Sequence, residues 1–105
     1  MIQHTEEIRA GWCVVAVRGR ADAEAADELE EALKAALKQN SKVAADFSGL
    51  DYISSAGLRA VLQAARAAQT LEAEFAICRL SPSVKKVFDM SRLHQILRVH
   101  GELPC

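Results

Sequence analysis

The chain has 105 residues and a formal net charge of −1, with 50% hydrophobic and 26% charged residues. This composition is typical of a single globular domain, here residues 1–105, and excludes a disordered chain. The balanced charge gives no basis for binding nucleic acid or an anionic membrane. No apolar run approaches the roughly 20 residues of a membrane span, and the acidic start lacks the apolar core of a signal peptide, so we expect a cytoplasmic protein.

The first part of the chain predicts a β-hairpin followed by a helix. Residues 3–9 alternate weakly, Gly11 marks a turn, and residues 12–17 form a clear β run. Residues 19–22 end this strand, and Asp22 is expected to be the N-cap of a helix over residues 23–38. The apolar positions of that helix, which share one face, are 26, 29, 33, 36 and 37.

The middle of the chain changes its hydrophobic period. Residues 43–47 are apolar and suit a buried strand, and Ser48-Gly49 is a turn signal. Ser54 and Ser55 then indicate the start of a helix that ends at Thr70 and has apolar residues at positions 58, 61, 62, 65 and 68. A serine at this junction lies at the carboxyl end of a strand, where the helix dipole favours negative charge.

The last third predicts a strand over residues 74–78 and a short helix that starts at Ser81-Pro82 and ends near Met90. The apolar residues beyond it suggest a further turn and a final strand; they are Leu93, Ile96, Leu97 and Val99. The predicted order is β-β-α-β-α-β-α-β. This order predicts an α/β domain with a mixed, mostly parallel sheet and helices packed on it.

Residues 46–58, DFSGLDYISSAGL, resemble the STAS family, whose pattern is approximately D-L-S-G-V-x-x-I-D-S-S-G-L. Residues 19–22 and 80–88 are similar to two further family stretches, so the resemblance covers nearly the whole chain. Within the family, the chain most resembles the free-standing anti-sigma factor antagonists. It departs from the pattern where Ser54 replaces an aspartate and Ala56 follows the second serine.

The resemblance implies a binding protein that acts by partner switching. Ser55 stands where the family is phosphorylated by an anti-sigma factor of the histidine-kinase-like ATPase type, and a serine phosphatase would reverse the modification. The expected contact residues are Asp22, Ser54, Ser55, Ala56, Gly57, Leu58 and Arg59. The alternative is a STAS subunit that binds constitutively in another assembly, such as a lipid ABC transporter or a stress-sensing complex.

Several of these residues also have a purely structural interpretation. Either Ser54 or Ser55 could cap the helix, and Asp22 could be a cap rather than a group beside the acceptor. Gly57 could serve helix packing or the close approach of a partner. Arg59 could belong to a solvated helix face or to a contact surface for an acidic partner, together with Gln63 and Arg66.

An enzyme is not expected. Ser55-Ala56-Gly57 resembles half of a hydrolase nucleophile elbow, and Ser55, Asp89 and His94 follow hydrolase chain order. However, Ile53 occupies the first glycine position, and neither an oxyanion-loop motif nor a phosphate-binding G-x-x-x-x-G-K-[ST] loop is present.

No cofactor or metal is expected either. The three histidines share no ligand spacing; they are His4, His94 and His100. The cysteines also lack metal-ligand spacing and are expected to be small buried hydrophobic residues in a reducing compartment; they are Cys13, Cys78 and Cys105.

Overall fold

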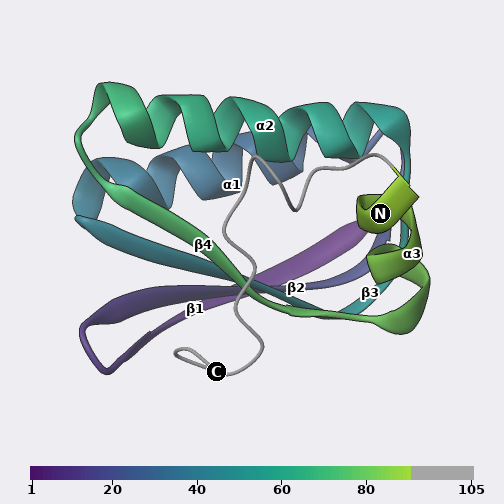
Figure 1. Cartoon of the computed structure of the whole chain (residues 1–105), viewed down its shortest axis with the longest axis horizontal. Helices are drawn as coiled ribbons and strands as arrows, with labels where there is room; N and C mark the ends of the chain where they lie inside the picture. The colour runs from purple at the N-terminus through teal and green to yellow at the C-terminus, as the bar shows by residue number, and fades with distance from the viewer. Residues whose placement is uncertain (91–105) are drawn as a thin grey trace.

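The computed structural model describes residues 1–90, which form a four-stranded sheet and three helices (Figure 1). In chain order the elements are β1 (Ile2–Arg9), β2 (Trp12–Ala21), α1 (Ala26–Gln39), β3 (Lys42–Ile53), α2 (Ser55–Thr70), β4 (Glu74–Leu80) and α3 (Pro82–Met90). The strand order is β1-β2-β3-β4, with β1 antiparallel to β2 and the other pairs parallel. The predicted mixed, mostly parallel sheet is confirmed, while the predicted final strand lies outside the described residues.

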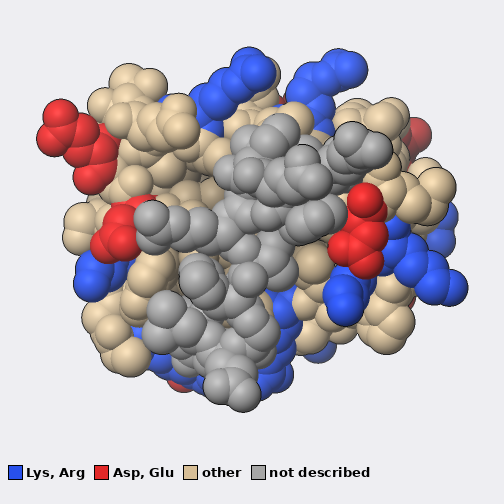
Figure 2. Space-filling view, in the orientation of Figure 1, with Lys and Arg blue, Asp and Glu red and all other residues tan. Residues whose placement is uncertain are grey.

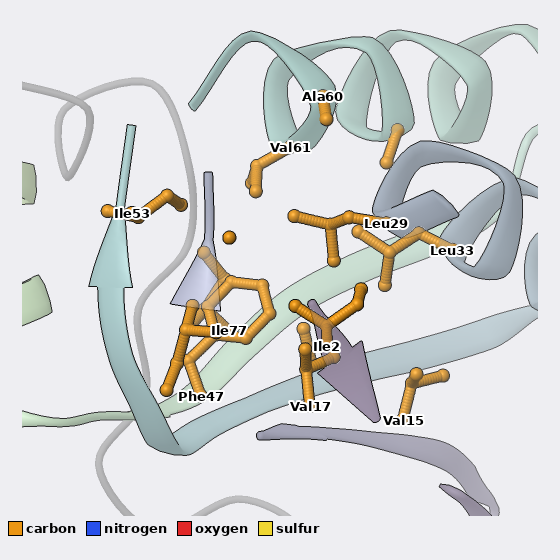
Figure 3. Packing of buried hydrophobic residues seen from close by; sticks show 14 of the residues in the cluster. Ile2, Val15, Val17, Leu29, Leu33, Phe47, Ile53, Ala60, Val61 and Ile77 are labelled. Carbon is orange, nitrogen blue, oxygen red and sulfur yellow. The ribbon is translucent and has the colours of Figure 1, made fainter. Parts of the chain in front are cut away.

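The two long helices lie side by side over one face of the sheet, and the main core fills the space between these layers (Figure 1). Leu29 and Leu33 of α1 point toward Val15 and Val17 of β2 and toward Phe47 of β3 (Figure 3). The apolar stripe predicted for α1 is confirmed, because its buried residues are Ala26, Leu29, Ala32, Leu33, Ala36 and Leu37. Burial of this stripe fixes the rotation of the helix about its own axis.

The turn predicted at Ser48-Gly49 is wrong, because β3 continues to Ile53. Asp46 Oδ1 accepts a hydrogen bond from Ser48 N–H at 3.0 Å, which gives a local irregularity in the pairing rather than a chain reversal. At Gly49 an added Cβ would lie 2.7 Å from Cγ of Arg18 on β2. Gly49 therefore leaves room for the side chain of Arg18. Strand β3 continues beyond it and ends at Ile53, directly before Ser54.

The helix predicted from residue 23 begins instead at Ala26, and its N-cap is Ala25, which makes no side-chain capping bond. Asp22 is therefore not the helix cap. Its Oδ1 accepts from Ala25 N–H at 3.0 Å and closes a turn that precedes the helix. Aspartate commonly closes such turns for the same reason that it caps helices, so the two roles look alike in a sequence.

The short helix α3 starts as predicted, with Ser81 accepting from Val84 N–H at 3.3 Å. Ser81 Oγ also donates to the carbonyl of Leu50 at 2.5 Å, and Ser83 Oγ donates to the carbonyl of Asp51 at 3.0 Å. These bonds fix α3 beside the last residues of β3, at the same end of the sheet as the start of α2. Among residues 1–90, no helix is long and apolar enough to cross a membrane.

Two of the three cysteines lie in the described part of the chain, and both are buried as predicted. Cys13 is a free thiol that donates to Glu6 Oε1 at 3.5 Å. Burial, this hydrogen bond and the charge of Glu6 together raise the pKa of Cys13 to about 11. The thiol is therefore protonated and weakly nucleophilic at neutral pH. Cys78 is buried in a smaller cluster with Trp12.

Candidate functional site

The carboxyl ends of β2 and β3 meet at one edge of the sheet. Ala21 and Ile53 are paired residues, and the backbone N–H of Ser54 donates to the carbonyl of Ala21 at 2.9 Å. Asp22 follows Ala21 directly, so the structure brings the loop that carries Asp22 against the start of α2. These two segments are 32 residues apart in the chain, and the parallel pairing of β2 with β3 joins them.

Ser54 is the N-cap of α2, as the sequence allowed. Its Oγ accepts from Gly57 N–H at 3.1 Å and donates to the carbonyl of Ala21 at 3.0 Å. The hydroxyl thus uses its proton and one lone pair inside the domain, and the side chain is half-buried. A serine in this position stabilises the helix start by about 1 kcal/mol. Ser54 is therefore held by contacts inside the domain.

Ser55 is the first residue of α2 and is exposed. Its hydroxyl makes no hydrogen bond to any other residue of the part that the structure describes. The N–H groups at a helix start and the helix dipole together give this position a partial positive charge. The two adjacent serines therefore differ sharply, because Ser54 is bonded to the sheet while Ser55 is exposed and its hydroxyl has no partner within residues 1–90.

Gly57 lies in the first turn of α2, two residues after Ser55, and is buried. A Cβ at this position would lie 2.8 Å from Cγ1 of Ile53 and 2.9 Å from the carbonyl oxygen of Ala21. Both distances are shorter than real contacts allow, so the first turn of α2 sits as close to the strand ends as a glycine permits. These contacts support the packing interpretation of Gly57, which places Ser55 at a fixed height above the sheet edge.

The remaining predicted contact residues of α2 differ in exposure. Ala56 and Leu58 are half-buried, and Leu58 packs against the main core, whereas Arg59 is exposed. Helix α2 contains two arginines and no acidic residue. Figure 2 shows basic side chains projecting from the edge of the molecule along which α2 runs in Figure 1.

An aromatic pair near this edge was not found by sequence reasoning. The guanidinium carbon of Arg20 lies 4.5 Å from the centre of the Tyr52 ring, and Tyr52 is 40% exposed. The two residues are partners in the β2–β3 register, one position before the Ala21–Ile53 pair. Only the strand register brings them together, so no local sequence pattern could have revealed the contact.

Other predicted residues near this edge have the following places. Asp51 is exposed near the end of β3, and Asp22 is half-buried and lies 3.7 Å from the N-terminal amine. Asp89 of the hydrolase order is exposed on α3, and His94 lies outside the described residues. Within residues 1–90, no three His, Cys, Asp or Glu side chains gather into a metal site.

Comparisons with known proteins identify the family. The STAS domain family model matches residues 1–103. BtrV of Bordetella bronchiseptica, named as an anti-sigma factor antagonist, is 37% identical over 90 residues, which are 85% of this chain and 78% of BtrV. The crystal structure of an anti-sigma factor antagonist from Mycobacterium paratuberculosis has a TM-score of 0.82 at 24% identity, over 98% of this chain and 88% of that chain. The structure of unphosphorylated SpoIIAA has a TM-score of 0.74 at 22% identity, over 95% of this chain and 90% of the SpoIIAA chain. The chain belongs to the STAS domain family.

Proposed function

We propose that this protein is an anti-sigma factor antagonist that works by partner switching. The name of BtrV supports the general role, since BtrV is 37% identical to this chain. SpoIIAA, a Bacillus cell fate determinant with a similar fold, has been solved in unphosphorylated and phosphorylated forms. In its unmodified form the present protein would bind an anti-sigma factor and so release the sigma factor or other client of that partner.

Ser55 is the proposed phosphoacceptor, and the observation that carries the proposal is the contrast between Ser54 and Ser55. The Ser54 hydroxyl is hydrogen-bonded to Gly57 N–H and to the carbonyl of Ala21, while the Ser55 hydroxyl is exposed and without a partner among the described residues. A kinase could therefore reach Ser55 without opening the helix start. Modification of Ser54 would first require both of its internal hydrogen bonds to break.

The proposed chemistry takes place in the complex and uses ATP and magnesium bound by the partner. The γ-phosphoryl group moves to Ser55 Oγ, the bond to ADP breaks, and the hydroxyl proton passes to a base of the partner. The domain supplies the acceptor hydroxyl on a rigid helix start, fixed by the Ser54 cap and by the packing of Gly57. Such fixed placement is how a protein substrate lowers the orientational cost of the transfer.

The product would leave its partner because of the new charge. A phosphoserine adds about −1.5 to −2 charges at neutral pH and three acceptor oxygens. The start of α2 favours an anion, but a partner packed over Ser55 would have to remove water from that anion without neutralising it. A serine phosphatase would then restore the unmodified, binding form.

The direct test is to incubate the protein with its cognate kinase-type anti-sigma factor and ATP, and to map the phosphate by mass spectrometry. We expect phosphate on Ser55, and we expect Ser55→Ala to abolish the modification while Ser54→Ala reduces helix stability but leaves Ser55 modified. Phosphate confined to Ser54, or to a residue outside this turn, would refute the assignment. A protein that binds its partner equally well with and without phosphate would instead be a constitutive STAS subunit.

A further inference from the structure

Arg59 lies one helical turn beyond Ser55 and has no counter-ion among residues 1–90. Its side chain is exposed, and it takes part in no ion pair, hydrogen bond or ring contact within residues 1–90. This differs from Lys34 on α1, which pairs with Glu30 at 2.6 Å in the same i,i+4 spacing. No acidic residue of α2 can neutralise Arg59, because α2 contains none.

Arg59 lies four residues after Ser55 on α2. Residues four apart lie on the same face of a helix, with Cβ atoms about 5–6 Å apart. Side chains on a helix lean toward its N-terminus, so the guanidinium of a residue at i+4 extends back over the residue at i. The i,i+4 spacing therefore allows the Arg59 side chain to reach the position that a phosphate on Ser55 would occupy. A guanidinium binds phosphate oxygens with two parallel N–H donors.

We infer that Arg59 is the intramolecular counter-ion of phosphorylated Ser55. This inference rests on the proposed function, in which Ser55 is the acceptor, and adds a second consequence of phosphorylation. In the unmodified protein Arg59 is available to a partner. In the phosphorylated protein Arg59 is engaged by the phosphate, so the modification both adds a negative charge and withdraws a positive one from the contact surface.

The test places phosphoserine at position 55 during translation, so that no kinase is needed, and follows the phosphorus resonance through a pH titration. A nearby cation favours the doubly charged phosphate and therefore lowers the pKa of its second ionisation, which is ordinarily about 6. Arg59→Gln should raise the titration midpoint, and Arg59→Lys, which keeps the charge, should remain below Arg59→Gln. The matched control is Arg66→Gln, since Arg66 lies about 16 Å farther along the helix axis than Ser55 and should leave the midpoint unchanged.

A second readout is the melting temperature. Phosphorylation should raise it by about 1–4 °C more in the wild-type protein than in Arg59→Gln, the effect expected of one i,i+4 ion pair in a domain of this size. The inference is overturned if Arg59→Gln titrates like the wild type, or if Arg66→Gln shifts the midpoint equally. Neither result depends on the kinase, so the two proposals can fail separately. A failed phosphorylation assay would refute the proposed function but not the pairing of Arg59 with phosphoserine. An unchanged titration midpoint in Arg59→Gln would refute the pairing but not the proposed function.

Discussion

At Gly57 the site depends on the absence of a side chain. The position lies in the first turn of a helix, where glycine costs up to about 1 kcal/mol relative to alanine. The structure explains why that cost is tolerated, since a methyl group would meet the Ala21 carbonyl oxygen and the Ile53 side chain within 3 Å. The sequence motif gave the position of this glycine and left open whether packing or partner approach explains it. The distinction required the end of β2, which lies far away in the chain.

Gly57→Ala should therefore lower stability, although alanine is the better helix former. Forcing a methyl group into a tightly packed contact costs about 1–3 kcal/mol, and the gain in helix propensity offsets at most about 1 kcal/mol of it. A net loss near 1 kcal/mol would lower the melting temperature by about 4–8 °C. Ala35→Gly, at an exposed position of α1, measures the propensity difference alone. If Gly57→Ala melts at a higher temperature than the wild type, the steric argument fails.

At the scale of elements, local patterns predicted the helices well and the connections poorly. The apolar stripe of α1 and the serine starts of α2 and α3 are set by residues within a few positions of one another. The stripe predicted for α2 is only partly right, because Val61 and Ala68 are buried while Leu58, Leu62 and Ala65 are half-buried. The error at Asp22 is also local, since an aspartate that closes a turn and one that caps a helix look alike in a sequence. The error at Ser48-Gly49 has a different origin, because β3 is extended by its pairing with β2. The Arg20–Tyr52 contact was missed for the same reason. Turn-forming residues in a sequence do not show whether a strand that is distant in the chain will pair with the same segment and keep it extended.

The loop between β2 and α1 offers a test of whether Asp22 has a role beyond structure. Asp22→Asn keeps the oxygen that accepts from Ala25 and removes the charge that lies 3.7 Å from the N-terminal amine. Since exposed ion pairs contribute about 0–1 kcal/mol, this variant should melt close to the wild type, whereas Asp22→Ala should lose about 1 kcal/mol with its hydrogen bond. We expect Asp22→Asn nevertheless to change the phosphorylation rate or the affinity for the partner.

The control for this comparison is Asp27→Asn, which removes the same charge from the exposed first turn of α1. Phosphorylation rates and partner affinities would be measured on the wild type, Asp22→Asn and Asp27→Asn with the same preparation of the partner. If Asp22→Asn and Asp27→Asn behave alike in both assays, Asp22 serves only to close its turn.

At the scale of the whole molecule, the site joins several elements. Ser54 connects α2 to the end of β2, and Ser81 and Ser83 connect α3 to the end of β3. The strand ends and helix starts are therefore fixed to one another, while Ser55 and Arg59 face outward. Such an arrangement suits recognition by a partner surface, and it indicates that a charge added at Ser55 would act at the surface instead of through the core.

Phosphorylated Ser55 should accordingly weaken partner binding without unfolding the domain. We expect the phosphorylated protein to melt within a few degrees of the unmodified one, because the start of α2 accommodates an anion. Titration calorimetry should show at least tenfold weaker binding to the partner, a loss of about 1.4 kcal/mol. Ser55→Ala should bind as the unmodified protein does and remain bound in the presence of ATP.

Ser41→Asp supplies the control for a general effect of added charge. Ser41 is exposed and immediately precedes β3, so it lies at the opposite end of that strand from Ser55. It should neither weaken binding nor change the melting temperature appreciably, whereas Ser55→Asp should weaken binding by less than phosphate does because it carries less charge. Equal losses from Ser41→Asp and Ser55→Asp would mean that overall charge repulsion governs the complex. Only a loss confined to position 55 places the partner directly over the start of α2.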